Sequence, residues 1–274
     1  MDSKKIIRND KRTPDQLRPV SFSRDIFEYA AGSVLFEMGN TKVLCAVSLQ
    51  NGVPPFLRGK GIGWLTAEYS LLPTSTMTRT QRESSSAGKN GRSVEIARFI
   101  GRCFRSIVDT STIGERTITI DCDVLQADGG TRTAAITGAF LALKMAQEYW
   151  LQARLLNQPI IIEHIAAVSV GVVDGNVLLD LNYQEDSVAT ADFNFVITQT
   201  NKIVEMQGGA ETAPLSWDTF EQVRATACHG ASTLFTFFEQ NSKNDRQASM
   251  QQRTESQPER VPLFSLKNRQ QSST

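Results

Sequence analysis

The stretch 117–146 constrains the fold most, because a strand pattern runs directly into a helix pattern through two adjacent glycines. Apolar residues alternate with threonines and aspartates over 117–124, which is the period of a strand with one buried face. From Thr133 onward, apolar residues recur at helical spacing. The junction Gly129-Gly130-Thr131-Arg132 therefore predicts a tight turn that places the first free N–H groups of a helix beside the Arg132 guanidinium.

This turn has the parts of an anion-binding site. The N–H groups at a helix N-terminus favour bound anions, and glycines let the backbone approach a ligand closely. On its own, however, a motif of this length is more often a structural turn followed by a surface arginine. Other parts of the sequence must decide between the two interpretations.

A second predicted helix N-terminus also carries an arginine. This helix begins near Ser93, and Arg92 stands at its entrance after a loop rich in Gly and Ser. A solvated helix face explains Arg98, Arg102 and Arg105, whereas Arg92 is placed to bind phosphate. If the two helix N-termini meet, their arginines hold one phosphate between them. The stretch from Arg79 to Arg105 is basic, with positions 79, 82, 89, 92, 98, 102 and 105 against acidic positions 83 and 95.

Acidic residues gather in a third segment, LLDLNYQEDSVATADFNF. Asp180 and Asp186 share a face if the segment is extended, and a bend around 182–186 brings both to one end of a sheet instead. Glu185 and Asp192 lie nearby. Turn-forming and capping aspartates are the alternative interpretation. Carboxylates hold a divalent cation or protonate a leaving oxygen, and arginines hold phosphate, so together they have the parts for phosphoryl transfer.

Length and composition limit the remaining possibilities. A chain of 274 residues, 40% hydrophobic, can bury one substantial core or two modest ones. No apolar run approaches the roughly 20 residues of a membrane span, and the start MDSKKIIRND lacks a signal-like apolar core, so we expect a cytoplasmic protein without membrane association. The formal net charge is zero, so a polyanionic partner must be argued from a local patch. We expect a polar N-terminal segment at 1–16, one domain at 17–240 and a disordered tail at 241–274.

Long motifs connect the chain to a known family. They run from about Arg12 to Glu239 through KRTPDQLRPV, GSVLFEMGNTKVLCAVSL, GWLTAEYSLLP, GRSVEIARFIGR, DCDVLQADGGTRTAAITGA, AAVSVGVV, LDLNYQEDS and EMQGGAE. Through them the chain resembles the ribonuclease PH family of bacterial phosphorolytic exoribonucleases. The resemblance implies one ribonuclease PH-type catalytic domain with an α+β, ribosomal protein S5 domain 2-like fold, in which helices pack on a mixed sheet. It also implies a ring-shaped homohexamer built as a trimer of dimers.

The implied reaction trims the 3′ end of transfer RNA precursors, and of other structured RNA such as ribosomal RNA. Inorganic phosphate is the co-substrate, a nucleoside 5′-diphosphate is released, and the reaction is reversible. By the family pattern, the phosphate-binding residues are Arg92, Gly130, Thr131 and Arg132. The family's catalytic carboxylates match Asp180 and Asp186, which are assigned jointly to Mg²⁺ and to protonation of the departing oxygen. RNA and subunit contacts are implied for Arg79 and Arg82.

One residue departs from the family pattern. Thr74 follows Leu72-Pro73 where an arginine is common, so we expect intact chemistry with a weaker or altered grip on RNA. Two other classes of function fit the sequence less well. A non-catalytic ring subunit of an exosome-type assembly would not need both aspartates and both arginines. A small-molecule kinase would need a longer glycine-rich loop than GGTR to cradle a triphosphate.

Overall fold

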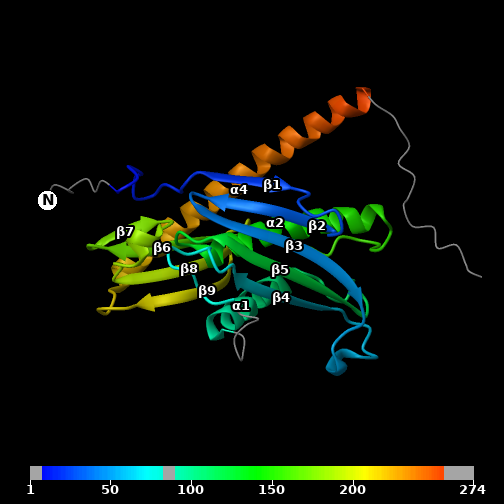
Figure 1. The fold of residues 1–274 in the computed structure, drawn as a ribbon, viewed down its shortest axis with the longest axis horizontal. Helices are drawn as coiled ribbons and strands as arrows, with labels where there is room; N and C mark the ends of the chain where they lie inside the picture. The colour runs from blue at the N-terminus through cyan, green and yellow to red at the C-terminus, as the bar shows by residue number, and fades with distance from the viewer. Residues whose placement is uncertain (1–7, 83–89, 256–274) are drawn as a thin grey trace, which may run out of the picture. The chain divides into compact units, whose positions relative to one another are not determined.

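The computed structural model describes residues 8–82 and 90–255, with side chains as far as residue 242 (Figure 1). The first sheet has the strand order β1-β2-β3-β5-β4, formed by Val20–Arg24, Gly32–Met38, Thr41–Asn51, Arg116–Gln126 and Trp64–Leu71. Strand β4 pairs with β5 in parallel, whereas the other neighbours are antiparallel. The sheet is therefore mixed, as predicted.

The second sheet is antiparallel throughout. Its order is β7-β6-β8-β9, formed by Asn176–Leu179, Ile165–Val173, Ala191–Thr198 and Ile203–Ala210. Tight hairpins form around Gly39-Asn40 and Asp174-Gly175, because glycines supply the left-handed backbone that such turns need.

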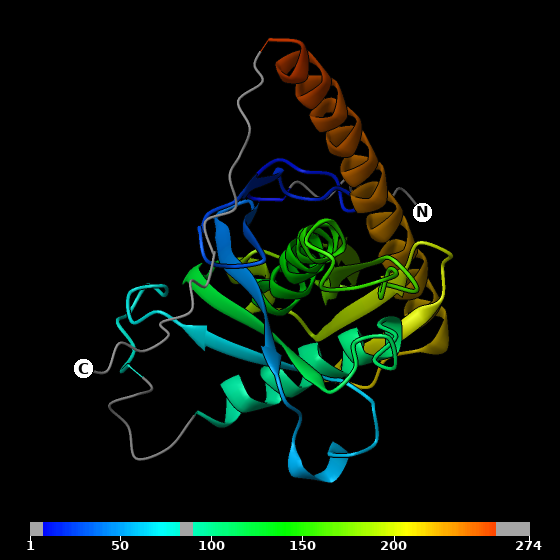
Figure 2. The same ribbon diagram turned by 90° about the vertical axis from the view of Figure 1, so that its right-hand side faces the viewer.

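Helix α2, Thr131–Gln152, fills the space between the two sheets. It contacts β2, β3 and β5 of the first sheet and β6 and β8 of the second (Figure 2, the green helix at the centre). Small side chains make this close packing possible, and Ala134, Ala135, Ala139 and Ala142 are fully buried. Larger buried side chains such as Phe140 and Trp150 each contribute about 1.5–3 kcal/mol of burial free energy.

Helix α1, Gly91–Ile107, is the helix predicted to begin near Ser93, and it covers β4 with an apolar face. Its buried side chains include Ile96, Phe99 and Phe104. Arg92 and Arg102 are exposed, whereas Arg105 is half-buried and faces β4. Asn90 caps the helix by accepting a hydrogen bond from the Arg92 backbone N–H at 3.1 Å. The cap fixes where the helix begins, and therefore the position from which the Arg92 side chain extends.

Helix α4, Trp217–Glu255, extends further than the sequence predicts. The chain forms two compact units, of which the first ends at Phe235 and the second begins at Thr236. Disorder was expected from residue 241, yet the helix continues through 241–255. This stretch has no Gly or Pro, and it contains three Gln and two Arg, which are good helix formers. Residues 256–274 of the predicted tail lie outside the described residues. Within the described ranges, no helix is long and apolar enough to span a membrane.

Candidate active site

A cavity of about 790 Å³ opens where the N-termini of α1 and α2 meet the second sheet. Its lining joins segments that are far apart in the sequence. The lining residues most relevant to chemistry are Arg92, Gly129, Gly130, Thr131, Arg132, Ser169, Asp186, Asp192, Asn194, Gln207 and Glu211. Arg92, the Gly130–Arg132 turn and Asp186 therefore line one cavity. Asp180 does not line it.

The glycine turn forms the anion-binding part of the cavity, which we call the cradle and define as residues 129–132. Gly129 and Gly130 have φ angles of 72° and 63°, a left-handed conformation that glycine adopts without steric cost. The first backbone hydrogen bond of α2 runs from Ala134 N–H to Gly130 O at 3.0 Å, so the N–H groups of 131–133 have no helical acceptor. The first turn contains no acidic residue, so the positive end of the helix dipole faces the cavity uncompensated.

Two arginine side chains face the cavity here, Arg132 of the cradle and Arg92 of α1, and only that of Arg132 is held by other described residues. Arg132 is held by Glu95 of α1, with Nη1 donating to Oε1 at 3.1 Å, and by Gln207 Oε1 of β9 at 3.0 Å. Arg92 forms no ion pair with any residue in the described ranges, and its side chain is exposed. The cavity thus has one fixed guanidinium and one that is available to a ligand.

The acidic wall consists of Asp186 at the end of α3, Tyr183–Asp186, together with Asp192 and Glu211. Burial raises the pKa of Asp186, and the charges of Asp192 and Glu211 raise it further. Burial and Glu211 raise the pKa of Asp192 in the same way. Arg92 and Arg132 oppose both shifts. Asp186 is exposed and Asp192 is half-buried. Two carboxyl groups whose pKa values are raised are suited to holding and passing a proton.

Asp180 has a different place from the one predicted. It is buried, with 1% of its surface exposed, and its carboxylate Oδ2 accepts the Arg18 backbone N–H at 2.8 Å and Arg18 Nε at 2.9 Å. Arg12 Nη1 lies 3.5 Å from the same oxygen. The six-residue spacing suggested a role shared with Asp186, but Arg18, remote in sequence, occupies the carboxylate. The structure therefore places the Asp180 carboxylate on Arg18 and not among the residues that line the cavity with Asp186.

The N-terminal segment supports this region from Arg8 onward. Arg8 binds Glu185 through two hydrogen bonds of 2.7 and 2.6 Å and donates to the carbonyl oxygens of Leu179 at 2.8 Å and Asp180 at 3.0 Å. Arg12 Nη1 also donates to the Asp180 carbonyl, at 3.0 Å. These bonds hold Asp180 in a left-handed conformation with φ of 54°. The sequence indicated only a polar segment here, since the acceptors lie about 170 residues away.

The donor set fits a divalent cation only in part. Among the described residues, no group of three or more His, Cys, Asp or Glu could hold a metal ion by itself. Mg²⁺ typically takes one or two carboxylates and completes its shell with water and substrate phosphate. Asp186 and Asp192 fit that pattern, because both carboxyl groups line the cavity. Asp180 does not fit it.

Ser169 is a further cavity residue that the sequence did not single out. It lies on β6, directly across from Asn194 on β8, and both residues line the cavity. Its hydroxyl is buried and has no hydrogen-bond partner among the described residues. A buried hydroxyl without a partner costs about 1–3 kcal/mol, so this group marks a polar surface that a ligand or water can satisfy.

Most basic residues of the loop after β4 and of α1 do not line this cavity. Arg79 and Arg82 are exposed and do not line the cavity, although Thr78 and Thr80 of the same loop do. Position 89 lies outside the described residues. On α1, Arg102 forms an ion pair with Glu205, with Nη2 2.5 Å from Oε1. The surface interpretation of the α1 arginines therefore holds for Arg102.

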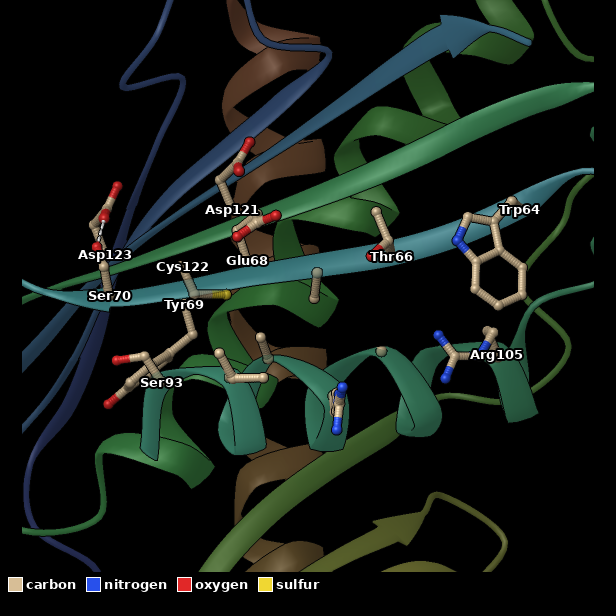
Figure 3. Close-up of a pocket in the computed structure, with 15 residues that line it drawn as sticks. Trp64, Thr66, Glu68, Tyr69, Ser70, Ser93, Arg105, Asp121, Cys122 and Asp123 are labelled. Atoms are coloured by element: carbon tan, nitrogen blue, oxygen red, sulfur yellow. Dashed lines mark hydrogen bonds between the residues drawn. The ribbon is translucent and has the colours of Figure 1, made fainter. Parts of the chain in front are cut away.

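A second groove of about 520 Å³ lies between α1 and the strands β4 and β5 (Figure 3). Glu68, Asp121 and Asp123 line its sheet side. Arg105, from α1, packs over the Trp64 ring at 4.8 Å and donates to Leu65 O at 3.0 Å. These contacts give Arg105 a structural role.

Comparisons with known proteins agree with this architecture. Residues 16–147 match domain 1 of the 3′ exoribonuclease family, and residues 164–230 match domain 2. The fold is the ribosomal protein S5 domain 2-like α+β fold that the sequence predicts.

Solved structures of the same fold come from plants and archaea. Rice (Oryza sativa) Rrp46 is 20% identical with a TM-score of 0.69, over 85% of this chain and 98% of that one. The Archaeoglobus fulgidus exosome with RNA bound to the active site is 22% identical with a TM-score of 0.71, over 84% and 92%. An archaeal exosome core is 22% identical with a TM-score of 0.68, over 85% and 91%. The two matched family domains together span well over half of the sequence, and the chain therefore belongs to the 3′ exoribonuclease family.

Proposed function

We propose that the chain is a phosphorolytic 3′–5′ exoribonuclease that trims the 3′ ends of transfer RNA precursors and other structured RNA. The observation that carries this proposal is that an anion cradle and an acidic wall line the same cavity. Phosphorolysis needs both, since free phosphate must be held beside the terminal phosphodiester while the departing 3′ oxygen receives a proton.

In this reaction, the N–H groups of 131–133 and the guanidinium groups of Arg92 and Arg132 bind inorganic phosphate. An oxygen of that phosphate attacks the phosphorus of the last phosphodiester bond. The bond to the 3′ oxygen of the preceding nucleotide breaks, and Asp186 protonates that oxygen. The products are a nucleoside 5′-diphosphate and an RNA shorter by one nucleotide.

Asp186 and Asp192 are also the residues that would hold Mg²⁺. When bound, the ion would neutralise charge on the reacting phosphate oxygens. Asp180 does not contact the substrate in this proposal, and it acts through Arg18. It fixes Arg18, which in turn donates through Nη1 to Asp128 O and through Nη2 to Gly129 O at 3.4 Å. Asp180 is therefore a positioning residue for the cradle.

We further propose that the active form is a homohexameric ring, a trimer of dimers, as the resemblance to the ribonuclease PH family implies. The solved structures of similar fold are exosome subunits and cores, which supports assembly with RNA-binding partners of the same fold. Mass in solution tests this directly. A mass of six chains is expected, and a monomer would contradict it.

The deciding experiment incubates purified protein with a 3′-extended transfer RNA, with and without inorganic phosphate. Phosphate-dependent release of nucleoside diphosphates is expected, together with the reverse reaction when diphosphates are supplied. Tight RNA binding without products in either buffer would instead indicate a non-catalytic ring subunit, the alternative that the exosome-like fold keeps open. Release of nucleoside monophosphates without phosphate would indicate hydrolysis.

A further inference from the structure

Tyr69 of β4 reaches the cradle from the core side. Its hydroxyl donates a hydrogen bond to Thr131 Oγ1 at 3.1 Å. Both side chains are buried, with exposed fractions of 4% for Tyr69 and 9% for Thr131. Figure 3 shows the Tyr69 side chain directed toward the start of α1 near Ser93, on the opposite side of the strand from Glu68. Tyr69 thus touches the anion-binding turn without lining the large cavity.

This hydrogen bond determines what the Thr131 hydroxyl can do. A hydroxyl has one proton to donate, and its oxygen accepts through lone pairs. Because Thr131 Oγ1 accepts from Tyr69, its own proton is free to point elsewhere. Thr131 lines the cavity, and within the described ranges no protein atom accepts that proton. The neighbouring Thr133 differs, because its hydroxyl donates to Gly130 O at 2.9 Å.

Tyr69 remains a donor throughout the working range of pH. Burial raises the pKa of Tyr69 to about 12, and the hydrogen bond to Thr131 offsets this only in part. Arg92 and Arg132 are close enough to lower the pKa further. The phenol is therefore protonated at neutral pH, and the charges of Arg92 and Arg132 act on it.

We infer that Tyr69 is a positioning residue for bound inorganic phosphate, which it serves by directing the Thr131 hydroxyl proton into the cavity. This inference rests on the proposed function, since it assigns a supporting residue to the same phosphate site. In the reaction, Thr131 donates to a phosphate oxygen and Tyr69 does not touch the substrate. Removal of the Tyr69 hydroxyl leaves the Thr131 hydroxyl free to rotate and to turn its proton away from the ligand.

The test is a double-mutant cycle built from Tyr69→Phe, Thr131→Ala and the combined variant. Phosphate binding is measured by calorimetry with inorganic phosphate alone, and the KM for phosphate is measured with transfer RNA in excess. Tyr69→Phe is expected to weaken phosphate binding about 3- to 10-fold, the size of one modest hydrogen bond, without changing the affinity for RNA. In the Thr131→Ala background, the same change is expected to have no further effect.

Two control variants exclude a merely structural role. Tyr149→Phe makes the same substitution at a half-exposed position in the last turns of α2, and phosphate binding is expected to stay at the wild-type level. Thr131→Ser retains the hydroxyl, so Tyr69→Phe is expected to weaken phosphate binding again in that background. Independent, additive losses from Tyr69 and Thr131 would overturn the inference, as would wild-type phosphate binding by Tyr69→Phe.

The calorimetric arm also separates this inference from the proposed function. If the wild-type protein binds phosphate but releases no nucleoside diphosphate, the proposed reaction fails while the coupling of Tyr69 to Thr131 is still measured. If the protein is active and the cycle shows no coupling, only the inference fails. A wild-type protein that binds no phosphate at all would overturn both.

Discussion

Arg18 Nη2 lies 2.6 Å from Asp180 Oδ1, and both side chains of this ion pair are at least 96% buried. Removing one member of a buried pair leaves an uncompensated charge in a medium that solvates it poorly. The pair also carries the bonds from Arg18 to the carbonyls of Asp128 and Gly129. The Asp180–Arg18 pair therefore contributes to the stability of the first unit and also holds the backbone of the cradle in place.

Asp180→Asn should lower the free energy of unfolding by about 3–5 kcal/mol, because Arg18 then loses its charged partner. Urea unfolding at neutral pH measures this. Glu37→Gln is the matched control, since Glu37 pairs with Lys42 at 2.7 Å on the surface and such pairs contribute about 0–1 kcal/mol. Similar small losses in both variants would contradict a structural role for Asp180.

Asp186→Asn should lower activity and not stability, the opposite of Asp180→Asn. We expect kcat to fall by about 10²- to 10⁴-fold, the usual contribution of a general acid, with no loss of stability. The reason is that Asp186 lines the cavity and its charge is unfavourable in the folded protein. Steady-state kinetics and thermal melts on the same preparation measure both effects. A variant with normal turnover would remove Asp186 from the catalytic group.

The pH dependence of stability follows from the same two carboxyl groups. The folded-state pKa values of Asp186 and Asp192 lie above the ordinary value of 3.8. Between 3.8 and those raised pKa values, the folded state binds more protons than the unfolded state, so the free energy of unfolding falls as pH rises through this window. The loss is complete once the pH lies above both raised pKa values.

The combined Asp186→Asn, Asp192→Asn variant should therefore be more stable than the wild type at neutral pH. Its advantage should shrink as pH falls through the window and vanish below the ordinary pKa of 3.8. Urea unfolding across this pH range measures the difference. An advantage that stays constant with pH would show that the two carboxyl groups do not titrate as proposed.

Local patterns predicted the β5–α2 junction well, because both periodicities and both glycines lie within one short stretch. The same locality explains why the contacts of Asp180 were not predicted. Its spacing from Asp186 was visible in the sequence, but the partner that occupies its carboxylate is Arg18, which lies 162 residues away. The role of Tyr69 was hidden for the same reason, since its contact with Thr131 spans 62 residues. Pairings of this kind depend on how sheets and helices pack.

Arg92→Ala should raise the KM for phosphate far more than it weakens RNA binding. Arg92 lines the cavity and forms no ion pair with described residues, so its charge is available to the ligand. Arg102→Ala is the control on the same helix, because its guanidinium is engaged by Glu205 outside the cavity. Phosphate titrations of the exoribonuclease assay and separate RNA-binding isotherms measure the two effects. Equal loss of phosphate and RNA affinity would argue against the cradle.

Gly129 of the cradle lies close to the backbone of the segment that leads into α3 and Asp186. A Cβ added to Gly129 would stand 2.5 Å from the carbonyl oxygen of Leu181 and 2.8 Å from the carbonyl carbon of Asn182. Both atoms belong to the backbone that leads into α3 and Asp186. A side chain at position 129 must therefore displace this backbone, and we expect Asp186 to move with it.

Gly129→Ala should accordingly abolish most phosphorolysis, because a displacement of about 1 Å between phosphate and acid can cost about 10²-fold in rate. Gly175→Ala is the matched control. Gly175 has nearly the same φ, 75° against 72°, but an added Cβ meets nothing within 4 Å. Both variants bear the left-handed strain of about 1–2 kcal/mol, and only Gly129→Ala should lose activity. Equal activities would show that the contact between Gly129 and Leu181 does not set the distance between cradle and acid.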